Sequence, residues 1–405
     1  MGNRSTAQVA QFIDETDWEK FPTIIHKTAK QLIFDNIGVA LAGSRSEAGR
    51  IIQQYVKEMG GPPEAPVLGT AIRAPVPLAV LANGVAAHAD DYDDTQIASL
   101  PDRVTGLLTH PTAPVLAAAL ATAVSTMASG QELLNAYEVG LEVACKLAEA
   151  INPEHYQRGF HSTGTIGTFG AFAAAAKLLR LKEPEIIRGI GIVASLASGL
   201  RGNFGTMTKP LHAGRAAENG IMAARLAKKG FTATPDILDS PWGFFSILGG
   251  GFDQEYLAAH LGRPFQLEQP GVSIKPYPCG SLAHPTMDVV RDLVLKNDLR
   301  PEMIERIDVG ITRHIRNPLR YQRPQTALEA KFSLEFGVTM IVLERKAGIH
   351  QYTDETVLSG PVQAFLPKVN CYIDAEMEAR GFDKMNSIVK AVSYTHLRAH
   401  ETGRN

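Results

Sequence analysis

The chain has 405 residues, of which 45% are hydrophobic and 20% charged, and its formal net charge is −2. This composition predicts a globular protein with room for two domains, and the small net charge excludes a global field that would recruit nucleic acid or an anionic membrane. The three cysteines lie far apart without a CxxC pair. Their spacing argues against zinc ribbons and iron–sulfur clusters and favours a reducing, cytoplasmic compartment.

Residues 1–264 predict a large, almost entirely helical domain. The predicted helices, separated by Gly or Pro, cover 28–43, 77–91, 113–128, 131–150, 163–179, 184–199 and 213–229. Several are apolar on all sides and rich in Ala and Gly, which is typical of helices in the middle of a bundle. The uncharged stretch 104–131 contains His110 and two prolines. Its continuous apolar part is shorter than the roughly 20 residues of a membrane span, so we expect no membrane partner.

The pattern changes beyond residue 264. Alternating apolar residues predict strands at 306–313 and 368–374, and the segment 327–348 between them predicts a helix. We therefore expect a mainly α fold, with a large all-helical domain and a smaller α+β lid domain over 265–391. The last residues, 392–405, follow no pattern and resemble the translated read-through of a sequencing adapter, so we exclude them from the predicted fold.

Residues 88–95 read HADDYDDT and place four carboxylates within five positions. Like charges three or four apart on a helix repel by roughly 0.2–0.5 kcal/mol per pair, so a metal, a cation, a hydrogen-bond network or solvation must compensate. If the helix continues, Asp91 and Thr95 share one face, while Asp90 and Asp94 share another that we expect to be solvated. Asp90 and Asp94 also fit the DDxxD motif of magnesium-dependent prenyl-diphosphate enzymes, an alternative that the α+β second part disfavours.

Cations gather in the segment 204–220, where Lys209, His212 and Arg215 come just before and within a predicted helix start. The N–H groups of a helix N-terminus favour anions, so these side chains could bind a carboxylate or phosphate. From this stretch alone, a helix start whose charged side chains are simply solvated is as good an interpretation as an anion-binding site.

Three further stretches carry polar side chains at the starts of predicted helices. They contain His161 in GFHSTGTIG, Lys275 and His284 in KPYPCGSLAHPTMD, and Tyr321 in LRYQRPQTALEAKFS. Loops of this kind commonly carry functional residues. Cys279 lies in the second stretch, but no nearby residue argues for a nucleophilic thiol.

Taken together and in this order, HADDYDDT, THPTAPVL, GFHSTGTIG, GTMTKPLHAGRAAENG, KPYPCGSLAHPTMD and RPQTALEAKFS resemble the motifs of the MmgE/PrpD family. The resemblance runs from about residue 8 to 391. It implies a homodimer without metal or cofactor and a small carboxylic acid as substrate. The residues that it matches to the family's site are Asp91, Thr95, His110, His161, Lys209, Lys275, His284 and Tyr321.

The resemblance also implies the chemistry. The family includes 2-methylcitrate dehydratase, an enzyme of propionate catabolism, as well as cis-aconitate decarboxylase and an iminodisuccinate epimerase. Each reaction can pass through a carbanion next to a carboxylate, which fixed cations and N–H dipoles must stabilise. We expect His161 or His110 to move the proton, Asp91, Lys209 and Tyr321 to complete the catalytic set, and the other residues to bind substrate.

The substrate is left open within the family, with dehydration of 2-methylcitrate as our first expectation. One departure bears on it. Residues 96–109, QIASLPDRVTGLLT, form a longer connection between Thr95 and His110 than in the decarboxylases of the family, and no Trp follows Thr95 directly.

Overall fold

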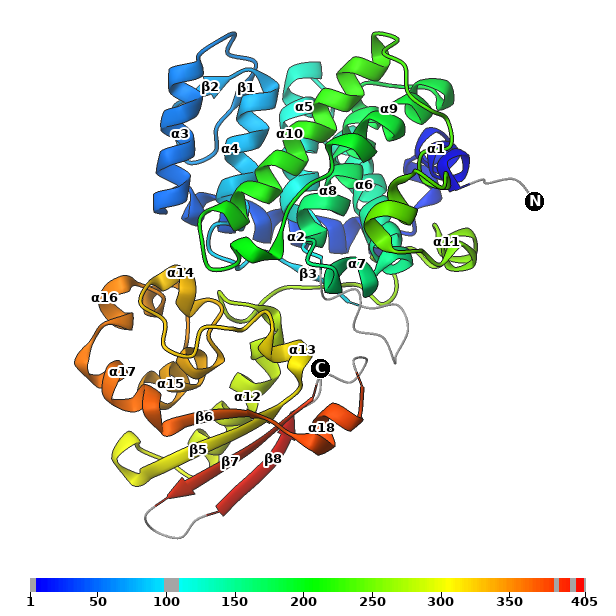
Figure 1. The fold of residues 1–405 in the computed structure, drawn as a ribbon. Coiled ribbons are helices and arrows are strands. Elements are labelled where there is room, and N and C mark those ends of the chain that lie inside the picture. Colours follow the sequence, from blue (N-terminus) through cyan, green and yellow to red (C-terminus); the bar gives the residue numbers. More distant parts are fainter. Residues whose placement is uncertain (1–4, 98–108, 382–385, 394–397, 404–405) are drawn as a thin grey trace. The chain divides into compact units, whose positions relative to one another are not determined.

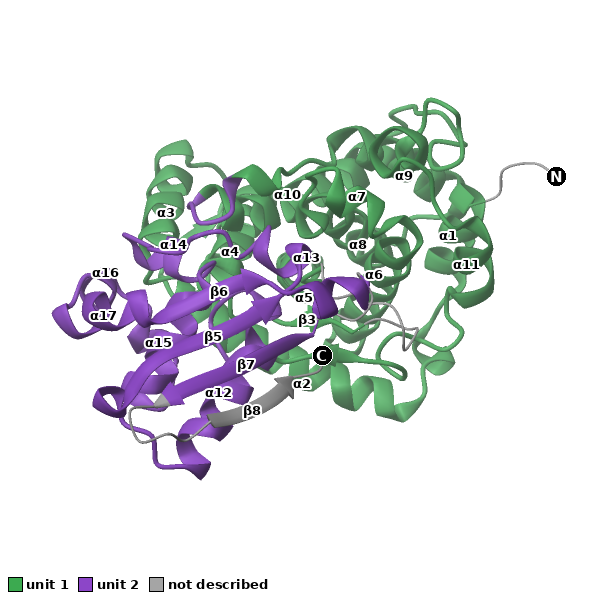
Figure 2. Cartoon of the chain, turned by 60° about the horizontal axis from the view of Figure 1, so that its bottom comes forward, with its two compact units in different colours: residues 1–99, 105–202, 208–274 green, residues 100–104, 203–207, 275–405 purple. Residues whose placement is uncertain are grey.

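The computed structural model describes residues 5–97, 109–381 and 386–393, and residues 398–403 by their backbone (Figure 1). The chain forms two compact units (Figure 2). Unit 1 comprises 1–99, 105–202 and 208–274, and unit 2 comprises 100–104, 203–207 and 275–405. The expected fold class, mainly α with a smaller α+β part, is confirmed.

Unit 1 is built from helices, with short strands at its loops. Its longer helices are α1 (Ser5–Glu15), α2 (Thr23–Gly43), α3 (Glu47–Met59), α4 (Val76–His88), α5 (Thr112–Thr126), α6 (Gly130–Ile151), α8 (Ser162–Leu178), α9 (Glu183–Leu196) and α10 (Thr208–Lys228). Its shorter helical segments are η1 (Trp18–Lys20), α7 (Glu154–Gln157), η3 (Arg201–Asn203), η4 (Phe245–Gly249) and α11 (Gln254–His260). Its strands are β1 (Ala65–Pro66), β2 (Arg73–Ala74), β3 (Thr95–Gln96) and β4 (Val272–Ser273).

Helix α8 occupies the middle of this bundle and contacts α5, α6, α9 and α10 (Figure 1). Apart from Lys177, every residue of α8 is buried. Its sequence, STGTIGTFGAFAAAAKL, contains mostly Gly, Ala and Thr, and these small side chains allow neighbouring helices to approach closely. The predicted buried helix therefore forms because small residues face every neighbour, and its N-terminus carries His161 into the interior.

The end of α4 differs from the prediction, which continued the helix through the acidic residues. The helix ends at His88, and Asp91 adopts a positive φ of 51°. Aspartate tolerates this left-handed conformation better than most residues because its short polar side chain can bond locally. The chain consequently turns away from the helix axis, so Asp91 and Thr95 do not share a helical face. Thr95 instead begins β3, which pairs antiparallel with β4.

Unit 2 contains a mixed sheet with strand order β6-β5-β7-β8. The strands are β5 (Ile304–Ile311), β6 (Val369–Ile373), β7 (Ser387–Ser393) and β8 (Arg398–Gly403). The helical segments are η5 (Ser281–Ala283), α12 (His284–Lys296), η6 (Pro301–Met303), α13 (Arg313–Arg316), α14 (Ala327–Ala330), α15 (Leu334–Glu344), η7 (Ile349–Gln351), α16 (Asp354–Val357), α17 (Gly360–Phe365), η8 (Leu366–Lys368) and α18 (Ala375–Ala379).

The strands expected at 306–313 and 368–374 are present as β5 and β6, which pair in parallel. The helix expected over 327–348 is divided into α14 and α15, because Ser333 caps α15 by accepting a hydrogen bond from the N–H of Phe336. Strand β8 falls within the segment that we excluded and pairs antiparallel with β7. The adapter origin of that segment stays a prediction.

The described helices include none with the length and apolar character that crossing a membrane would require.

Candidate active site

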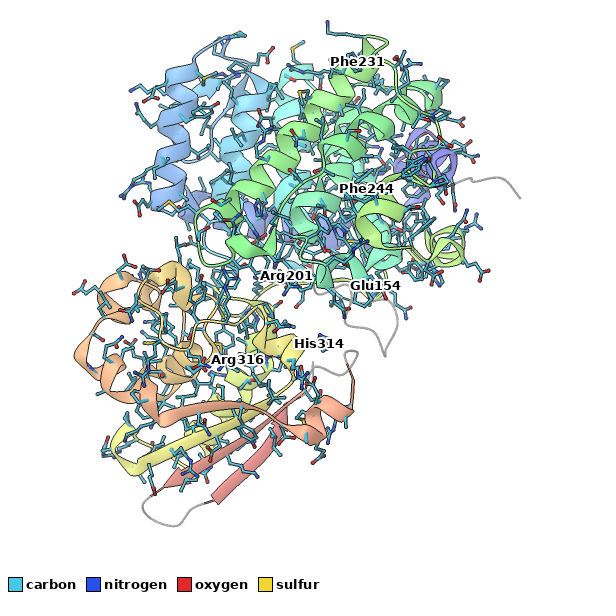
Figure 3. All side chains as sticks on the ribbon, in the orientation of Figure 1. Glu154, Arg201, Phe231, Phe244, His314 and Arg316 are labelled. Atoms are coloured by element: carbon cyan, nitrogen blue, oxygen red, sulfur yellow. The ribbon has the colours of Figure 1, made fainter. Side chains whose placement is uncertain are left out.

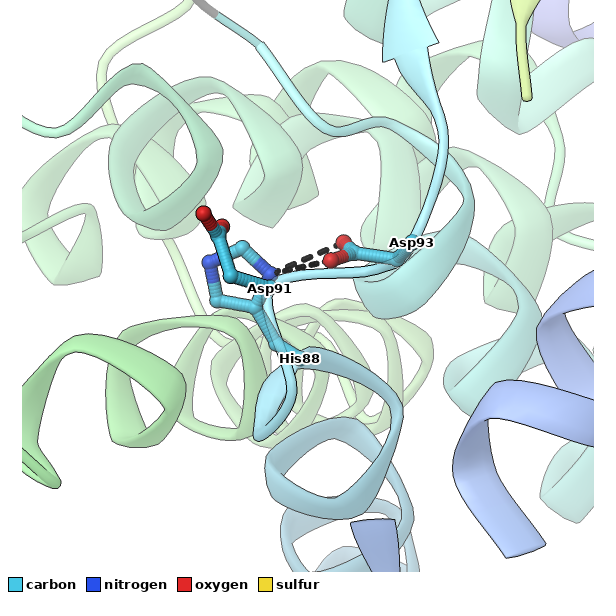
Figure 4. A group of neighbouring side chains, drawn as sticks. All are labelled: His88, Asp91 and Asp93. Atoms are coloured by element: carbon cyan, nitrogen blue, oxygen red, sulfur yellow. Dashed lines mark hydrogen bonds and ion pairs between the residues drawn. The ribbon is translucent and has the colours of Figure 1, made fainter. Parts of the chain in front are cut away.

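His88, Asp91 and Asp93 of the acidic motif lie side by side in unit 1 (Figure 4), and Lys209 contacts two of them. His88 ends α4, and its Nδ1 lies 2.8 Å from both carboxylate oxygens of Asp93. The Nζ of Lys209, from the first turn of α10, lies 2.7 Å from Nε2 of His88 and 2.7 Å from Oδ1 of Asp91. All four side chains are buried, so the carboxylates are compensated by a cation and hydrogen bonds rather than by solvent.

These contacts assign the protonation state of His88. A carboxylate only accepts hydrogen bonds, so Nδ1 of His88 carries the proton and donates to Asp93, while Nε2 accepts from Lys209. This is the neutral imidazole. It agrees with the lowered pKa of His88, whose burial outweighs the attraction of Asp93.

A metal ion is the other group that such residues could hold, because His88, Asp91 and Asp93 offer ligand atoms within 4.8 Å of one another. The Lys209 ammonium, however, already lies at hydrogen-bond distance from two of the three residues. A divalent cation there would meet this positive charge. The arrangement therefore fits the cationic side chain better than a metal.

Asp94 overturns the expectation of a solvated face. It is buried, and its two carboxylate oxygens accept hydrogen bonds from the backbone N–H and the hydroxyl of Thr112. The hydroxyl of Tyr137 lies 2.7 Å from that of Thr112. Burial, followed by the nearby charge of Asp93, raises the pKa of Asp94 to about 8. The raised pKa favours the protonated carboxyl of Asp94, and its hydrogen bonds with Thr112 take the place of the solvent contacts that we expected.

His110 lies next to this group. Its Nδ1 lies 2.8 Å from the carbonyl oxygen of Asp94 and 3.2 Å from Oγ1 of Thr95, and its backbone N–H donates to Oγ1 of Thr163. The carbonyl requires a donor, so Nδ1 carries the proton and Nε2 carries the lone pair. The His110 ring lies 5.0 Å from that of His88, between centroids.

His161 and His212 continue the group of imidazoles. His161 precedes α8, its ring centroid lies 5.6 Å from that of His88, and its Nδ1 lies 3.0 Å from Nδ1 of His212. Burial, and next the Lys209 charge, lowers the pKa of His161 well below its usual value. Burial likewise lowers the pKa of His212 to about 4. The lowered pKa values favour the neutral form of both rings, in which each ring offers one nitrogen lone pair as an acceptor.

The structure thus brings together six of the predicted site residues in unit 1, namely Asp91, Thr95, His110, His161, Lys209 and His212. Arg215 does not join them. Its guanidinium bonds Glu218 at 2.5 Å and Asn219 at 3.2 Å along its own helix. The helix starts five residues earlier than predicted, at Thr208, so Lys209 lies in its first turn and Arg215 farther along the helix.

The other predicted residues belong to unit 2. Nζ of Lys275 and Nε2 of His284 lie 3.2 Å and 3.1 Å from the carbonyl oxygen of Cys279. This shared acceptor holds the cation and the imidazole on one turn at the start of α12. Tyr321 donates its hydroxyl to the carbonyl oxygen of Phe204 over 3.0 Å. Arg320 donates to the same oxygen over 2.7 Å.

Some members of the site lay outside the predicted set. His88 and Asp93 were visible in HADDYDDT, where the histidine between a buried helix and an acidic run was the available signal. Thr112 and Tyr137 gave no such signal, because Thr and Tyr are common in helices and their contacts with Asp94 depend on the fold.

Comparison with known protein families covers most of the chain. Residues 7–257 match the MmgE/PrpD N-terminal domain, and residues 277–402 match the MmgE/PrpD C-terminal domain. The chain belongs to the MmgE/PrpD family. This membership confirms the predicted family and removes the prenyl-diphosphate alternative.

Relatives within the MmgE/PrpD family carry the name of an enzyme. Cis-aconitate decarboxylase of Homo sapiens is 30% identical over 376 residues, which cover 87% of this chain and 75% of the relative. The Mus musculus protein of that name is 29% identical, covering 85% and 71%. The Aspergillus terreus protein is 23% identical, covering 86% and 74%. An enzymatic role for this member of the family is therefore supported.

Proposed function

We propose that this protein is a metal-independent lyase that acts on small di- or tricarboxylic acids through a carbanion next to a carboxylate. The observation that carries the proposal is the buried contact of Lys209 with both His88 and Asp91, beside the rings of His161 and His110. Such an arrangement offers a fixed positive charge and groups that accept protons within one dry cluster.

Decarboxylation of cis-aconitate is the first candidate reaction, because it is the activity named for the relatives. The bond between the methylene carbon and its carboxylate breaks, and carbon dioxide leaves. The electron pair moves through the double bond to the carbon beside the far carboxylate. One proton then adds there and gives itaconate, so charge and atoms balance.

We assign a role in this reaction to each of the main groups in the cluster. Lys209 lies where it can stabilise the negative charge that spreads onto the carboxylate, and Asp91 fixes its direction. His161 and His110 are the candidates for moving the proton. The N–H groups at the start of α8, next to His161, add dipoles that favour an anion.

Dehydration of 2-methylcitrate is the second candidate. In its favour stands our expectation, from the family resemblance, that the connection 96–109 is longer than in the decarboxylases of the family. In this reaction a neutral histidine removes a proton beside a carboxylate, and hydroxide leaves from the neighbouring carbon. This activity would place the protein in propionate catabolism. The homodimer and the cytoplasmic location stay predictions alongside it.

The test uses the protein with cis-aconitate, 2-methylcitrate and citrate in D₂O with EDTA, followed by proton NMR. Itaconate would support the decarboxylase, and 2-methyl-cis-aconitate would support the dehydratase. Deuterium exchange without a new product would support carbanion chemistry on another acid, including epimerisation. Activity that disappears with EDTA and returns with magnesium would contradict the metal-independent mechanism.

A further inference from the structure

The charges of the cluster in unit 1 do not suit a substrate with several carboxylates. Asp91 and Asp93 accept hydrogen bonds as carboxylates, whereas Lys209 contributes one positive charge. His161 and His212 have lowered pKa values, chiefly through burial. These groups together are therefore slightly negative at neutral pH, and a di- or tricarboxylate needs a further cation nearby.

Arg201 is a cation on the same local scaffold as His161. The N–H of His161 donates to the carbonyl of Gly199, and the N–H of Arg201 donates to the carbonyl of Gly159. These two bonds flank an antiparallel bridge between Phe160 and Leu200. Arg201 and His161 therefore occupy diagonal positions across this bridge. Diagonal neighbours of this kind are about 7–8 Å apart, within reach of a long side chain.

The contacts of Arg201 orient its guanidinium without neutralising it. The guanidinium carbon lies 3.7 Å from the centroid of the Tyr156 ring, and Nη1 donates to the carbonyl of Tyr156 over 2.7 Å. In the described part of the chain no carboxylate forms an ion pair with Arg201, and its buried Nε has no hydrogen-bond partner there. Figure 3 labels Arg201 near Glu154, the first residue of α7.

Tyr156 links this arginine to the acidic motif. Burial raises the pKa of the Tyr156 phenol, the charge of Arg201 lowers it, and the charge of Asp91 raises it. The tyrosine is therefore within electrostatic range of both residues. Gly159 opposes Arg201 in the ladder at a φ of 101° and has open space around its Cβ position, so no side chain there obstructs the guanidinium.

We propose that Arg201 determines substrate specificity by binding a carboxylate of the substrate that does not react, with its planar edge held by stacking on Tyr156. This proposal rests on the proposed function, because it takes the substrate to be a di- or tricarboxylic acid. Arginine suits the task since its guanidinium matches a carboxylate with paired hydrogen bonds.

The test measures binding, so it does not depend on turnover. Tricarballylate, an unreactive tricarboxylate, and glutarate, which lacks its central carboxylate, are titrated calorimetrically into the wild type, R201Q, R201K and R158Q. Arg158 is a matched control because it is an exposed arginine at the end of α7, next to Gly159, which accepts the hydrogen bond of the Arg201 N–H. We expect R201Q to weaken tricarballylate binding by about tenfold to hundredfold and glutarate binding much less. The tricarballylate affinity of R201K should lie between those of R201Q and the wild type, and that of R158Q should equal the wild-type value.

Two results would overturn the assignment of Arg201. One is unchanged tricarballylate affinity in R201Q, and the other is an equal loss for both ligands, which indicates a structural role. If R201Q does not fold, R201K decides, because it keeps the charge and loses only the paired geometry. Wild-type protein that binds neither acid would instead overturn the proposed substrate class itself.

Discussion

At the scale of single residues, the buried pair of Lys209 and Asp91 carries the clearest consequence. A buried charge that loses its partner is costly, and a hydrogen bond to a charged group contributes about 1.5–3 kcal/mol. Asp91 therefore compensates the charge of Lys209 and fixes the position of its ammonium group, as the proposed function requires.

We expect Asp91→Asn to lower kcat by about tenfold to hundredfold, because the amide keeps the shape of the carboxylate and removes its charge. Asp90→Asn is the matched control, since Asp90 is the neighbouring half-buried carboxylate. It should change kcat by less than about twofold. Steady-state kinetics on the substrate found by NMR measures both, and equal losses in the two variants would contradict the role of Asp91.

Asp94 predicts an effect of pH on stability. The folded carboxyl keeps its proton up to about pH 8, whereas the reference value is 3.8, so the folded state binds more protons between these values. Its contribution to stability is present at low pH and is lost as the pH rises through this window. Asp94→Asn mimics the protonated form, so its free energy of unfolding should change less between pH 6 and pH 8 than that of the wild type.

Urea unfolding at several pH values measures this difference, with Asp90→Asn as the control. An equal loss of stability between pH 6 and pH 8 in Asp94→Asn and the wild type would show that the carboxyl is ionised in the folded protein.

At the scale of secondary-structure elements, α4 and α10 pack so closely that only glycine fits between them. A Cβ on Gly84 would lie 2.7 Å from Cα of Gly214. The obstacle is backbone, which cannot rotate away as a side chain would. This contact brings His88 on α4 and Lys209 on α10 to the same end of the two helices.

Gly84→Ala should therefore lower the free energy of unfolding by about 1–3 kcal/mol or more, as overpacked cores do. Gly38→Ala in α2 is the control, because no atom lies within 4 Å of its Cβ position. Alanine there should be neutral or stabilise by about 0.5–1 kcal/mol through helix propensity. Thermal unfolding compares the two, and a Gly84→Ala variant as stable as the wild type would contradict the packing argument.

The elements also show what the sequence could predict. The apolar segments that became α2, α5, α6, α8 and α9 were placed within a few residues, because a buried helix needs small or apolar side chains on every face. Six of the site residues taken from motifs lie together in unit 1, whereas Arg215 does not join them and the remaining three belong to unit 2. The end of α4 was predicted wrongly, since nothing local announces the positive φ of Asp91. The hydrogen bonds between Asp94 and Thr112 could not be predicted, because the two residues are 18 positions apart and only the folded chain brings them together.

At the scale of the whole molecule, several buried histidines make the fold sensitive to acid. The pKa values of His88, His155, His161 and His212 are all lowered, mainly because burial disfavours the charged ring. For His155 and His212 the value falls to about 4. The unfolded chain binds protons near pH 6.5 that the folded chain binds only near pH 4.

The contribution of these histidines to stability is therefore fully present above about pH 6.5 and decreases as the pH falls toward 4, by up to about 1.4 kcal/mol per pH unit for each histidine. In His155→Asn the free energy of unfolding should fall less steeply between pH 6.5 and pH 4 than in the wild type, although the variant also loses the hydrogen bond to Thr165. The exposed His350 provides the control, and His350→Asn should leave the slope unchanged. Urea unfolding at several pH values measures the slopes, and an equal slope in His155→Asn and the wild type would contradict this account.

The contact between Tyr321 and the carbonyl of Phe204 has a consequence for how sequences in this family diverge. Phe204 belongs to residues 203–207, a short piece of unit 2 that lies in the chain between two stretches of unit 1. In a chimera that takes all residues after 274 from a relative, the tyrosine hydroxyl would come from one protein and the carbonyl at position 204 from the other. The bond survives such an exchange because every amino acid supplies the same backbone carbonyl. Position 205 has no such freedom, since a Cβ there would lie 2.5 Å from the Tyr321 ring. A substitution at position 204 therefore keeps the hydrogen bond of Tyr321. A protein that keeps the tyrosine at position 321 in this place also needs glycine at position 205.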